Sequence, residues 1–524
     1  MNATDRFRGP SLWAAAALAL SQAVALDAWY WPGSLPDTDT SGAWTALADD
    51  LAHGTFYRPL QGPLGYGGTR YGPLFFTLHA GLIRMGLGPR SSGTVAVLLS
   101  AAAFGAALFF LMRSLGVRRS IALPATLLAY GTVTAQMMTL AVRGDYLAAA
   151  LNLAGVSLAV PWIREARIRS LLMASAAFAA ADLAKLTSAF GLLAVVAWGW
   201  LHFGRGRPLA LAGLALALIV AGYAGANAAS DGRMLADFLA VGAGGARIGP
   251  GLIPHAAVRF TLALGADPIL CLLLIQAAFS LVILADERPI GLPCLYSCAT
   301  LLATIAIFGS PGTYLNHTID LCGAAAAVTA VGLERHGDRR VVRWGVALYG
   351  LVLAATWLPG VPSIRQYFAG AHRPDLASVR LFLGRAGAGA HPMLATNPLL
   401  PIIAGERPVV ADAFNLELLL SRDPGLARGF YRRVADGEFG SVVLSNWPNL
   451  FPRDVDSPDD PIIGECWPAV ERSGALGAGL YPTLRDRYRI VMVRRPYIYL
   501  VKRENAGAFR MQGPGASPFF AGAR

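Results

Sequence analysis

The sequence predicts an α-helical polytopic membrane protein of about 11 spans, followed by a small C-terminal mixed α/β domain. Three observations support this fold class. The chain of 524 residues is 55% hydrophobic and only 15% charged, whereas soluble domains carry about 25% charged residues. Several apolar runs approach the roughly 20 residues with which a helix crosses a bilayer. These runs are continuous rather than alternating, which favours helices over a closed barrel.

The predicted spans follow the apolar runs of the N-terminal two thirds of the chain. We place them near 11–31, 93–112, 120–140, 145–162, 170–184, 187–203, 208–228, 268–285, 290–309, 317–333 and 342–359. Residues 73–86 and 255–266 are amphiphilic and too short to span, so we expect interfacial helices there. The N-terminus has no small-residue cleavage site before a polar start, so it is expected to remain as the first span.

The net charge of +12 comes almost entirely from arginine, because Lys185 and Lys502 are the only lysines. In a soluble protein such a charge suggests nucleic acid. Here the arginines fall in the loops that become cytoplasmic when the N-terminus is placed inside, so no nucleic-acid partner is expected. An odd number of spans then places the C-terminal segment outside. The expected location is the plasma (inner) membrane, with contacts to its lipids.

The composition divides the chain into three regions. Residues 1–364 form the transmembrane domain, with a long first outer loop at 32–92, and residues 365–505 form the extracytoplasmic α/β domain. The Gly-, Ala- and Pro-rich tail 506–524 is expected to be disordered. Within the α/β domain, strands are predicted at 392–398, 408–414 and 440–445, with a hairpin-like pair over 488–503. The five cysteines form no C-x-x-C pair, so neither a disulfide nor a thiolate metal site is proposed.

Polar residues from separate parts of the chain come out together on the outer face of this topology. Ionisable groups in or beside a membrane are costly and tend to mark function. They are Asp37, Asp39, Arg70, Arg143, Asp145, Lys185, Asn316, His317 and Asp320. This mixture of cations and carboxylates suits a substrate with a phosphate and a partner that carries a hydroxyl.

Asp37 and Asp39 open the segment "PDTDTSGAWTALADDLAHGTFY" of the first outer loop. Asp39 fits the N-cap of an interfacial helix. A carboxylate at this place could also take a proton from an attacking hydroxyl or hold a divalent cation. Capping and function are compatible, because caps lie at helix tips.

Three of the candidate residues begin or end predicted spans. Arg143 is either an interfacial anchor or a guanidinium that faces an anion and is oriented by Asp145. Lys185 lies three residues after Asp182 and could pair with it on one helix face. In a chain that otherwise uses arginine, its compact ammonium also suits a phosphate oxygen.

The segment "PGTYLNHTIDLCGAAAA" begins another predicted span from the outer side. His317 and Asp320 are three residues apart and share a helix face. Either Thr313 or Asn316 caps this helix, with a neutral histidine at the interface, or His317 and Asp320 form a ligand pair for a phosphate or a metal.

The string "YGGTRYGPLFF" places Arg70 directly before an apolar run. Gly67 and Gly68 would allow a tight turn or the close approach of a ligand. Tyr66 and Tyr71 suit the headgroup region or the face of a sugar. An ordinary aromatic turn with an anchoring arginine is the alternative.

The order of these segments resembles the GT-C superfamily of membrane glycosyltransferases. It looks closest to bacterial relatives of protein mannosyltransferases and of the lipid A aminoarabinose transferase, the family 39 type. The resemblance covers most of 1–360 in layout. It rests on the segments "AHGTFYRPL", "TRYGPLFFTLHAGLIRMG", "RGDYLAAALNLAGV", "LAKLTSAFGLLA" and "GTYLNHTIDLCGAAAA".

The resemblance implies a glycosyltransferase that moves a sugar from a polyprenyl-phosphate donor to a glycan, lipid or protein acceptor at the outer face of the membrane. The essential carboxylate lies in the first outer loop of such enzymes, where Asp39 fits best by spacing and Asp37 is the fallback. As base, it would deprotonate the acceptor hydroxyl, and the anomeric carbon would invert. A divalent metal held by Asp37, Asp39 or His317 stays an open alternative.

The remaining candidates follow from the same resemblance. The donor phosphate would be held by Arg70, Arg143, Lys185 and His317, with supporting roles for Asp145, Tyr71, Asn316 and Asp320.

Two other classes of membrane protein stay open. A transporter would place its charges at the midplane and repeat its halves. An O-antigen polymerase or ligase also uses lipid-linked sugars but places its large outer loop late in the chain.

Overall fold

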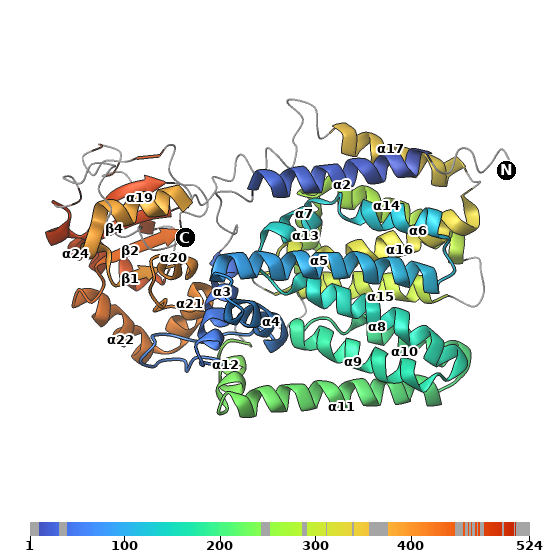
Figure 1. Cartoon of the computed structure of the whole chain (residues 1–524), viewed down its shortest axis with the longest axis horizontal. Helices are drawn as coiled ribbons and strands as arrows, with labels where there is room; N and C mark the ends of the chain where they lie inside the picture. The colour runs from blue at the N-terminus through green and yellow to red at the C-terminus, as the bar shows by residue number, and fades with distance from the viewer. Residues whose placement is uncertain are drawn as a thin grey trace.

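The fold is a bundle of helices with a smaller, sheet-containing unit at one end (Figure 1). The computed structural model describes residues 10–30, 39–242, 252–285, 291–310, 312–337, 340–355 and 376–445, and then 454–455, 460, 463, 467–468, 470–471, 476–494, 497–507 and 509. Asp37 and most of the tail 506–524 lie outside the described residues.

Each predicted span falls on a helix, and the span at 120–140 falls on two. The bundle helices are α2 (Pro10–Tyr30), α5 (Pro89–Ser114), α6 (Arg119–Ala129), α7 (Val133–Leu140), α8 (Asp145–Glu165), α9 (Ile168–Ala184), α10 (Phe190–Phe203), α11 (Gly206–Ala229), α14 (Pro268–Ala285), α15 (Leu292–Ile307), α16 (Ile319–His336) and α17 (Arg340–Ala355). The predicted fold class, a helical membrane protein with a small C-terminal α/β unit, is confirmed.

Four of these helices, α5, α8, α11 and α14, are long and apolar enough to cross a membrane by themselves. The pair α6 and α7 makes a fifth candidate, bent by 68°. At the bend Thr132 caps α7 by accepting from the Ala135 amide at 3.1 Å, and Asp267 accepts from the Thr134 amide at 2.8 Å. Side chains therefore satisfy the amides that the break sets free. The chain is a multi-pass membrane protein, while the full number of spans stays a prediction.

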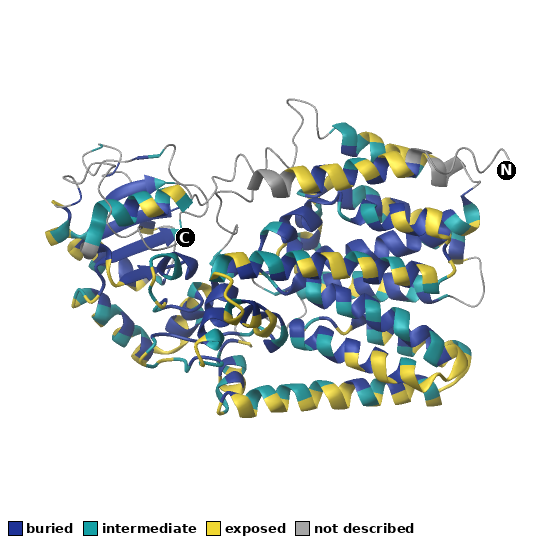
Figure 2. Ribbon diagram, viewed as in Figure 1, coloured by how far each residue is buried: buried dark blue, intermediate teal, exposed yellow. Residues whose placement is uncertain are grey.

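Burial distinguishes the centre of the bundle from its edge. Every residue of α16 from Ile319 to Leu333 is buried, whereas α11 buries only Pro208, Leu211 and Ala215. Figure 2 shows α11 as a largely exposed helix along one side. A helix that is covered all round belongs at the core, so α16 is the central helix of the bundle.

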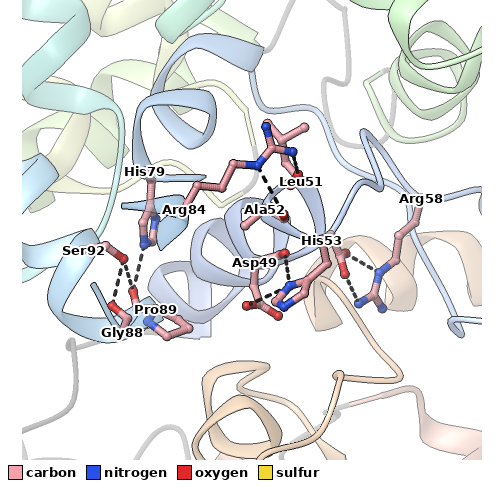
Figure 3. A network of polar contacts seen from close by, with 11 residues as sticks. Asp49, Leu51, Ala52, His53, Arg58, His79, Arg84, Gly88, Pro89 and Ser92 are labelled. Atoms are coloured by element: carbon pink, nitrogen blue, oxygen red, sulfur yellow. Dashed lines mark hydrogen bonds and ion pairs between the residues drawn. The ribbon is translucent and has the colours of Figure 1, made fainter. Parts of the chain in front are cut away.

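Four shorter helices lie outside the predicted spans: α3 (Asp39–Ala52), α4 (Pro73–Arg84), α12 (Arg233–Val241) and α13 (Leu252–Gly265). Of these, α3, α4 and α12 lie between the bundle and the sheet unit (Figure 1). Helices α4 and α13 coincide with the predicted interfacial segments. Arg84 of α4 donates to the Leu51 and Ala52 carbonyls at the end of α3, at 2.7 and 3.2 Å (Figure 3).

The C-terminal unit is a mixed four-stranded sheet with helices, in the strand order β1-β2-β4-β3. Strand β1 is parallel to β2, and the other pairs are antiparallel. Its elements are α19 (Leu376–Ala386), η2 (Gly387–Ala390), β1 (Met393–Ala395), α20 (Leu399–Ile403), α21 (Ala413–Arg422), α22 (Pro424–Ala435), β2 (Ser441–Ser445), η3 (Ala478–Leu480), α24 (Tyr481–Arg487), β3 (Tyr488–Arg494), β4 (Tyr497–Lys502) and η4 (Arg503–Asn505).

One predicted strand, 408–414, is wrong. Val410 makes only an isolated parallel bridge with Tyr66. Asp412 then caps α21 by accepting from the Asn415 amide at 3.1 Å. The β-branched residues Val409 and Val410 suggested a strand, but the capping Asp412 starts a helix directly after them.

The loop before α4 joins the bundle to the C-terminal unit. Arg58, which is 1% exposed, pairs with Asp50 of α3 and donates to the carbonyls of Leu64 and Pro408. Tyr66 is fully buried in the core of the C-terminal unit, with its ring 5.2 Å from Phe430. The expectation that Tyr66 faces headgroups or a sugar is therefore wrong, because the bridge to Val410 turns it into the core.

The two glycines of this loop serve the packing of the chain on itself. Gly68 has φ of +94°, which favours glycine. A Cβ at Gly67 would lie 2.6 Å from the Pro59 carbonyl oxygen. The close neighbour of Gly67 is therefore the backbone of Pro59, whereas the approach of a ligand to these glycines stays a prediction.

Candidate functional site

A buried ion pair joins two helix ends at the end of the bundle that faces the sheet. Asp145 is the first residue of α8, and Lys185 is the C-cap of α9. The Lys185 Nζ atom lies 2.6 Å from Asp145 Oδ1. Asn316, in the short helix η1 (Leu315–Thr318), donates to the same oxygen at 3.0 Å. Three predicted site residues from separate parts of the chain therefore meet at one atom.

The sequence left open whether Lys185 pairs with Asp182. In the structure Lys185 pairs with Asp145. Helix α9 ends at Ala184, and Lys185 has an extended backbone with φ of −155° and ψ of 113°. Its side chain therefore leaves the helix face that carries Asp182. The Tyr223 hydroxyl donates to the backbone carbonyl of Asp182 at 2.9 Å.

The other predicted cations surround this pair. His317 lies within electrostatic reach of Lys185, Asp145, Arg143 and Arg70. Its Nδ1 atom is buried and has no hydrogen-bond partner among the described residues. Arg143 is also within reach of Asp145. The site is thus a half-buried cluster of cationic side chains around the buried carboxylate of Asp145.

Asp320 lies deeper, in the first turn of α16. It is 2% exposed and accepts from Asn152 Nδ2 of α8 at 3.1 Å. Lys185 and Asp145 act on it electrostatically. Asp320 therefore connects the cluster to the core of the bundle.

Arg70 extends the cluster toward the C-terminal unit. Its guanidinium lies 5.4 Å from the centre of the Phe414 ring in α21, and Gly312 is its neighbour on the bundle side. The loop that carries Gly312 is held by Arg259 of α13, which donates to the carbonyls of Phe308, Ser310 and Thr313 at 3.1, 2.6 and 3.0 Å. Arg259 could not be predicted as a site residue, because nothing in the local sequence marks an arginine that binds a distant loop.

Tyr71 connects the first outer loop to the carboxylate of Asp412, which is not among the predicted site residues. Its ring stacks on Trp44 of α3, with centroids 4.5 Å apart. Its side chain hydrogen-bonds Asp412. Burial raises the pKa of Asp412, while hydrogen bonds from the Asn415 amide and Tyr71 and the charge of Arg70 lower it. The capping pattern after Asp412 was the available signal, but it indicates only a helix start.

The loop before Arg70 is held by another buried acid, Asp237 of α12. Its Oδ2 atom accepts from the Thr69 amide at 3.3 Å. Burial raises the pKa of Asp237 to about 7, although the hydrogen bonds from the Thr69 and Gly68 amides lower it.

Asp39 stands at the contact between the bundle and the sheet. It is the first residue of α3, and Ser445 Oγ at the end of β2 lies 2.8 Å from each of its carboxylate oxygens. Burial raises the pKa of Asp39 to about 6, while the Ser445 hydrogen bond lowers it and the charge of Asp412 raises it. Such a carboxyl changes its protonation near neutral pH, as a general base must.

A network of polar contacts joins α3, the helix that begins at Asp39, to α4 and α5 (Figure 3). His79 of α4 bonds the Pro89 carbonyl at the start of α5 at 2.8 Å. Asp49 of α3 contacts His53 at 3.5 Å. Arg84 ties α4 to the end of α3, and His79 ties α4 to α5, so these contacts hold α3 to the bundle through α4.

The described residues contain no group of three or more His, Cys, Asp or Glu side chains that could hold a metal ion. Asp37 lies outside that part of the chain. A metal site built from Asp37, Asp39 and His317 therefore stays a prediction.

The comparisons with known proteins concern the fold. No protein-family model matches the sequence, and no curated protein is recognisably related to it. Among solved structures, ArnT from Cupriavidus metallidurans bound to undecaprenyl phosphate is similar, with a TM-score of 0.59 and 13% identity over 94% of this chain and 98% of that chain. The chain has the GT-C fold. The resemblance read from the sequence is thereby confirmed at the level of the fold.

Two further structures agree with the GT-C fold. The apo form of the same ArnT has a TM-score of 0.58, 13% identity and the same coverage of both chains. The Archaeoglobus fulgidus oligosaccharyltransferase in its apo form has a TM-score of 0.53 and 11% identity, over 91% of this chain and 72% of that chain. The likeness extends through both the GT-C bundle and the C-terminal unit, because it covers more than nine tenths of this chain.

Proposed function

We propose that the protein is a glycosyltransferase that moves a sugar from a polyprenyl-phosphate donor to a glycan, lipid or protein acceptor of the cell envelope. The observation that carries the proposal is the gathering of Arg70, Arg143, Lys185 and His317 at the end of the bundle that also holds Asp39. The similarity to ArnT, whose crystal structure holds undecaprenyl phosphate, supports a lipid phosphate as the ligand of these cations.

The cationic cluster suits the leaving group of this reaction. When the bond from the sugar to the phosphate breaks, negative charge grows on the phosphate oxygens, and fixed cations stabilise that charge. Asp145 and Asn316 hold the Lys185 ammonium in place before any ligand arrives. Arg143 and Arg70 would complete the contacts to the phosphate, with His317 as a further donor.

Asp39 is proposed as the general base, with Asp37 as the fallback. The acceptor hydroxyl gives its proton to the carboxylate, and its oxygen forms a bond to the anomeric carbon from the face opposite the phosphate. The bond between the anomeric carbon and the phosphate oxygen breaks, and its electron pair leaves with the polyprenyl phosphate. The product is inverted at the anomeric carbon.

The proposed setting is the outer face of the plasma (inner) membrane. The distribution of arginines supports this orientation. The turn before α6 and the end of α16 meet through Arg118 and Glu334, at 2.7 Å, away from the sheet unit. Residues 1–364 would then form the catalytic membrane domain and 365–505 an extracytoplasmic domain.

The test uses the purified full-length protein in vesicles and a donor labelled in its sugar, prepared with both hexoses and pentoses. The proposal predicts that label moves to an acceptor fraction of the envelope and that free polyprenyl phosphate appears in equal amount. A transporter would move the intact donor without cleaving it, and an O-antigen polymerase or ligase would leave the monophosphate donor unused. Either of these outcomes, without transfer from the monophosphate donor, would contradict the proposal.

A further inference from the structure

Two hydroxyl side chains follow the carboxyl ends of the parallel strands β1 and β2. Thr396 comes directly after β1, and Ser445 is the last residue of β2. The Thr396 amide donates to the Val443 carbonyl at 3.0 Å, which extends the ladder by one residue. The Ser445 amide donates to Thr396 Oγ1 at 2.9 Å, and the two hydroxyl oxygens lie 2.8 Å apart. The fold of the sheet therefore holds the two hydroxyls together.

These contacts define a direction for the hydrogen bonds. An ionised Asp39 carboxylate can only accept, so the Ser445 hydroxyl donates its hydrogen bond to Asp39. Ser445 Oγ then accepts from the Thr396 hydroxyl at 2.8 Å and lies at the same distance, 2.8 Å, from each Asp39 oxygen. A hydroxyl supplies one proton and accepts through its lone pairs, so every polar atom in this chain of contacts is satisfied.

A second contact fixes the same strand end against α3. A Cβ at Gly42 would lie 2.0 Å from Asn397 Oδ1, so α3 approaches the residue after Thr396 more closely than any side chain allows. Asn397 is itself held, because its Nδ2 donates to the Tyr497 hydroxyl at 2.6 Å and its Oδ1 accepts from the Leu399 amide at 3.0 Å. The first turn of α3 thus rests on the sheet at two points.

From this geometry we infer that Ser445, supported by Thr396, is a positioning residue that aims the Asp39 carboxylate at the acceptor hydroxyl. The C-terminal unit therefore completes the catalytic site. This inference rests on the proposed role of Asp39 as base. It adds that the base is held by a sheet whose residues are more than 350 positions away in sequence.

The electrostatic surroundings give this role a measurable signature. The described groups that act on Asp39 are Ser445, whose hydrogen bond favours the ionised form, and Asp412, whose charge disfavours it. Although burial raises the pKa of Asp412, the hydrogen bond from Tyr71 and the charge of Arg70 both lower it and help to keep Asp412 ionised. Removal of the Ser445 hydroxyl should therefore move the acid limb of the pH profile upward.

The test measures kcat/KM for sugar transfer between pH 5 and pH 8 with the full-length protein and the labelled polyprenyl-phosphate donor. For Ser445→Ala, the apparent pKa of the acid limb should rise by about 1 unit. This is the size expected for the loss of a hydrogen bond to a charged group. The plateau at high pH should fall about 10-fold, because the base is less well aimed. Ser445→Thr, which keeps the hydroxyl, should restore the limb.

Two further variants separate this role from a structural one. Thr396→Val removes the supporting hydroxyl while Ser445 remains, and it should shift the limb in the same direction by a smaller amount. Ser421→Ala removes an exposed hydroxyl of α21 that bonds only the Leu418 carbonyl, and its profile should match the wild type. A Ser445→Ala protein with the wild-type limb and plateau would overturn the inference.

Asp39→Asn distinguishes the two levels of the proposal. If it is inactive while Ser445→Ala behaves as wild type, the positioning role is wrong and the proposed base stands. If Asp39→Asn keeps its turnover, the proposed base is wrong, and the role of Ser445 is overturned with it.

Discussion

Lys185 Nζ lies 2.6 Å from Asp145 Oδ1, across the gap between the end of α9 and the start of α8. The two side chains are 7 to 16% exposed, so water screens their attraction only weakly. Asn316 donates to the same carboxylate oxygen from a third element. The ammonium is thereby held where Arg143, His317 and Arg70 converge.

Removal of this ammonium should impair transfer. We expect Lys185→Met to lower kcat/KM by about 100-fold, as for the loss of one charged group that stabilises the transition state. It should also lower the free energy of unfolding by about 3 kcal/mol, because Asp145 is left buried without its counter-ion. Lys502→Met is the matched control, since Lys502 is the other lysine of the chain and lies at the end of β4. A Lys185→Met protein with wild-type kcat/KM would contradict this role.

The pH dependence of the reaction follows from Asp39. Because the pKa of Asp39 is raised to about 6, kcat/KM should fall about 10-fold per pH unit below pH 6. The raised pKa of Asp39 affects stability in the opposite direction, because stability falls with rising pH while activity increases. A carboxyl with a raised pKa stabilises the fold when protonated, and this contribution is lost as the pH rises through 6. Asp39→Asn should therefore unfold at pH 8 at a temperature no lower than the wild type, and a rate that is constant from pH 5 to pH 8 would contradict the assignment.

Arg70 should matter for the donor more than for the fold. It is partly exposed and stacks on Phe414, so Arg70→Ala should raise the KM for the polyprenyl-phosphate donor about 10-fold and change the unfolding temperature little. Arg118→Ala is the control, because Arg118 is 52% exposed and pairs with Glu334 away from the site. Equal KM values for the two variants would argue against a phosphate contact by Arg70.

Arg58 should stabilise the packing of the bundle against the C-terminal unit. Its buried guanidinium pairs with Asp50 and binds the carbonyls of Leu64 and Pro408. We expect Arg58→Met to lower the free energy of unfolding by about 3 to 5 kcal/mol, because Asp50 loses its partner in the interior. The double variant Asp50→Asn/Arg58→Met should be less destabilised than the sum of the single variants. Additive losses, measured by denaturant unfolding in detergent, would show that the pair is not coupled.

The sequence predicted the parts of the structure that depend on local pattern. Long apolar runs and the arginine bias identified the helices, and the resulting topology placed Arg143, Asp145, Lys185 and Asn316 on one face, where the structure brings them together. The partner of Lys185 was not predictable by spacing, because α9 ends one residue earlier and the side chain turns toward α8.

The contributions of the C-terminal unit could not be read from the sequence. Ser445, Thr396 and Asp412 reach the site only because the sheet docks on α3 and on the loop that carries Tyr66. That docking depends on contacts between residues hundreds of positions apart, such as Arg58 with Pro408. In the sequence, Asp412 falls within a predicted strand at 408–414. Ser445 is the last residue of the predicted strand at 440–445, and nothing else marks it.

The central claim is that Asp39 serves as the base in transfer from a polyprenyl-phosphate sugar. The most direct measurement compares wild type and Asp39→Asn in vesicles at pH 7.5, following label from the donor into acceptor, with the unfolding temperature of both proteins as the control for folding. The account predicts a loss of at least about 100-fold in transfer, with donor binding retained. Transfer by Asp39→Asn at close to the wild-type rate would contradict it.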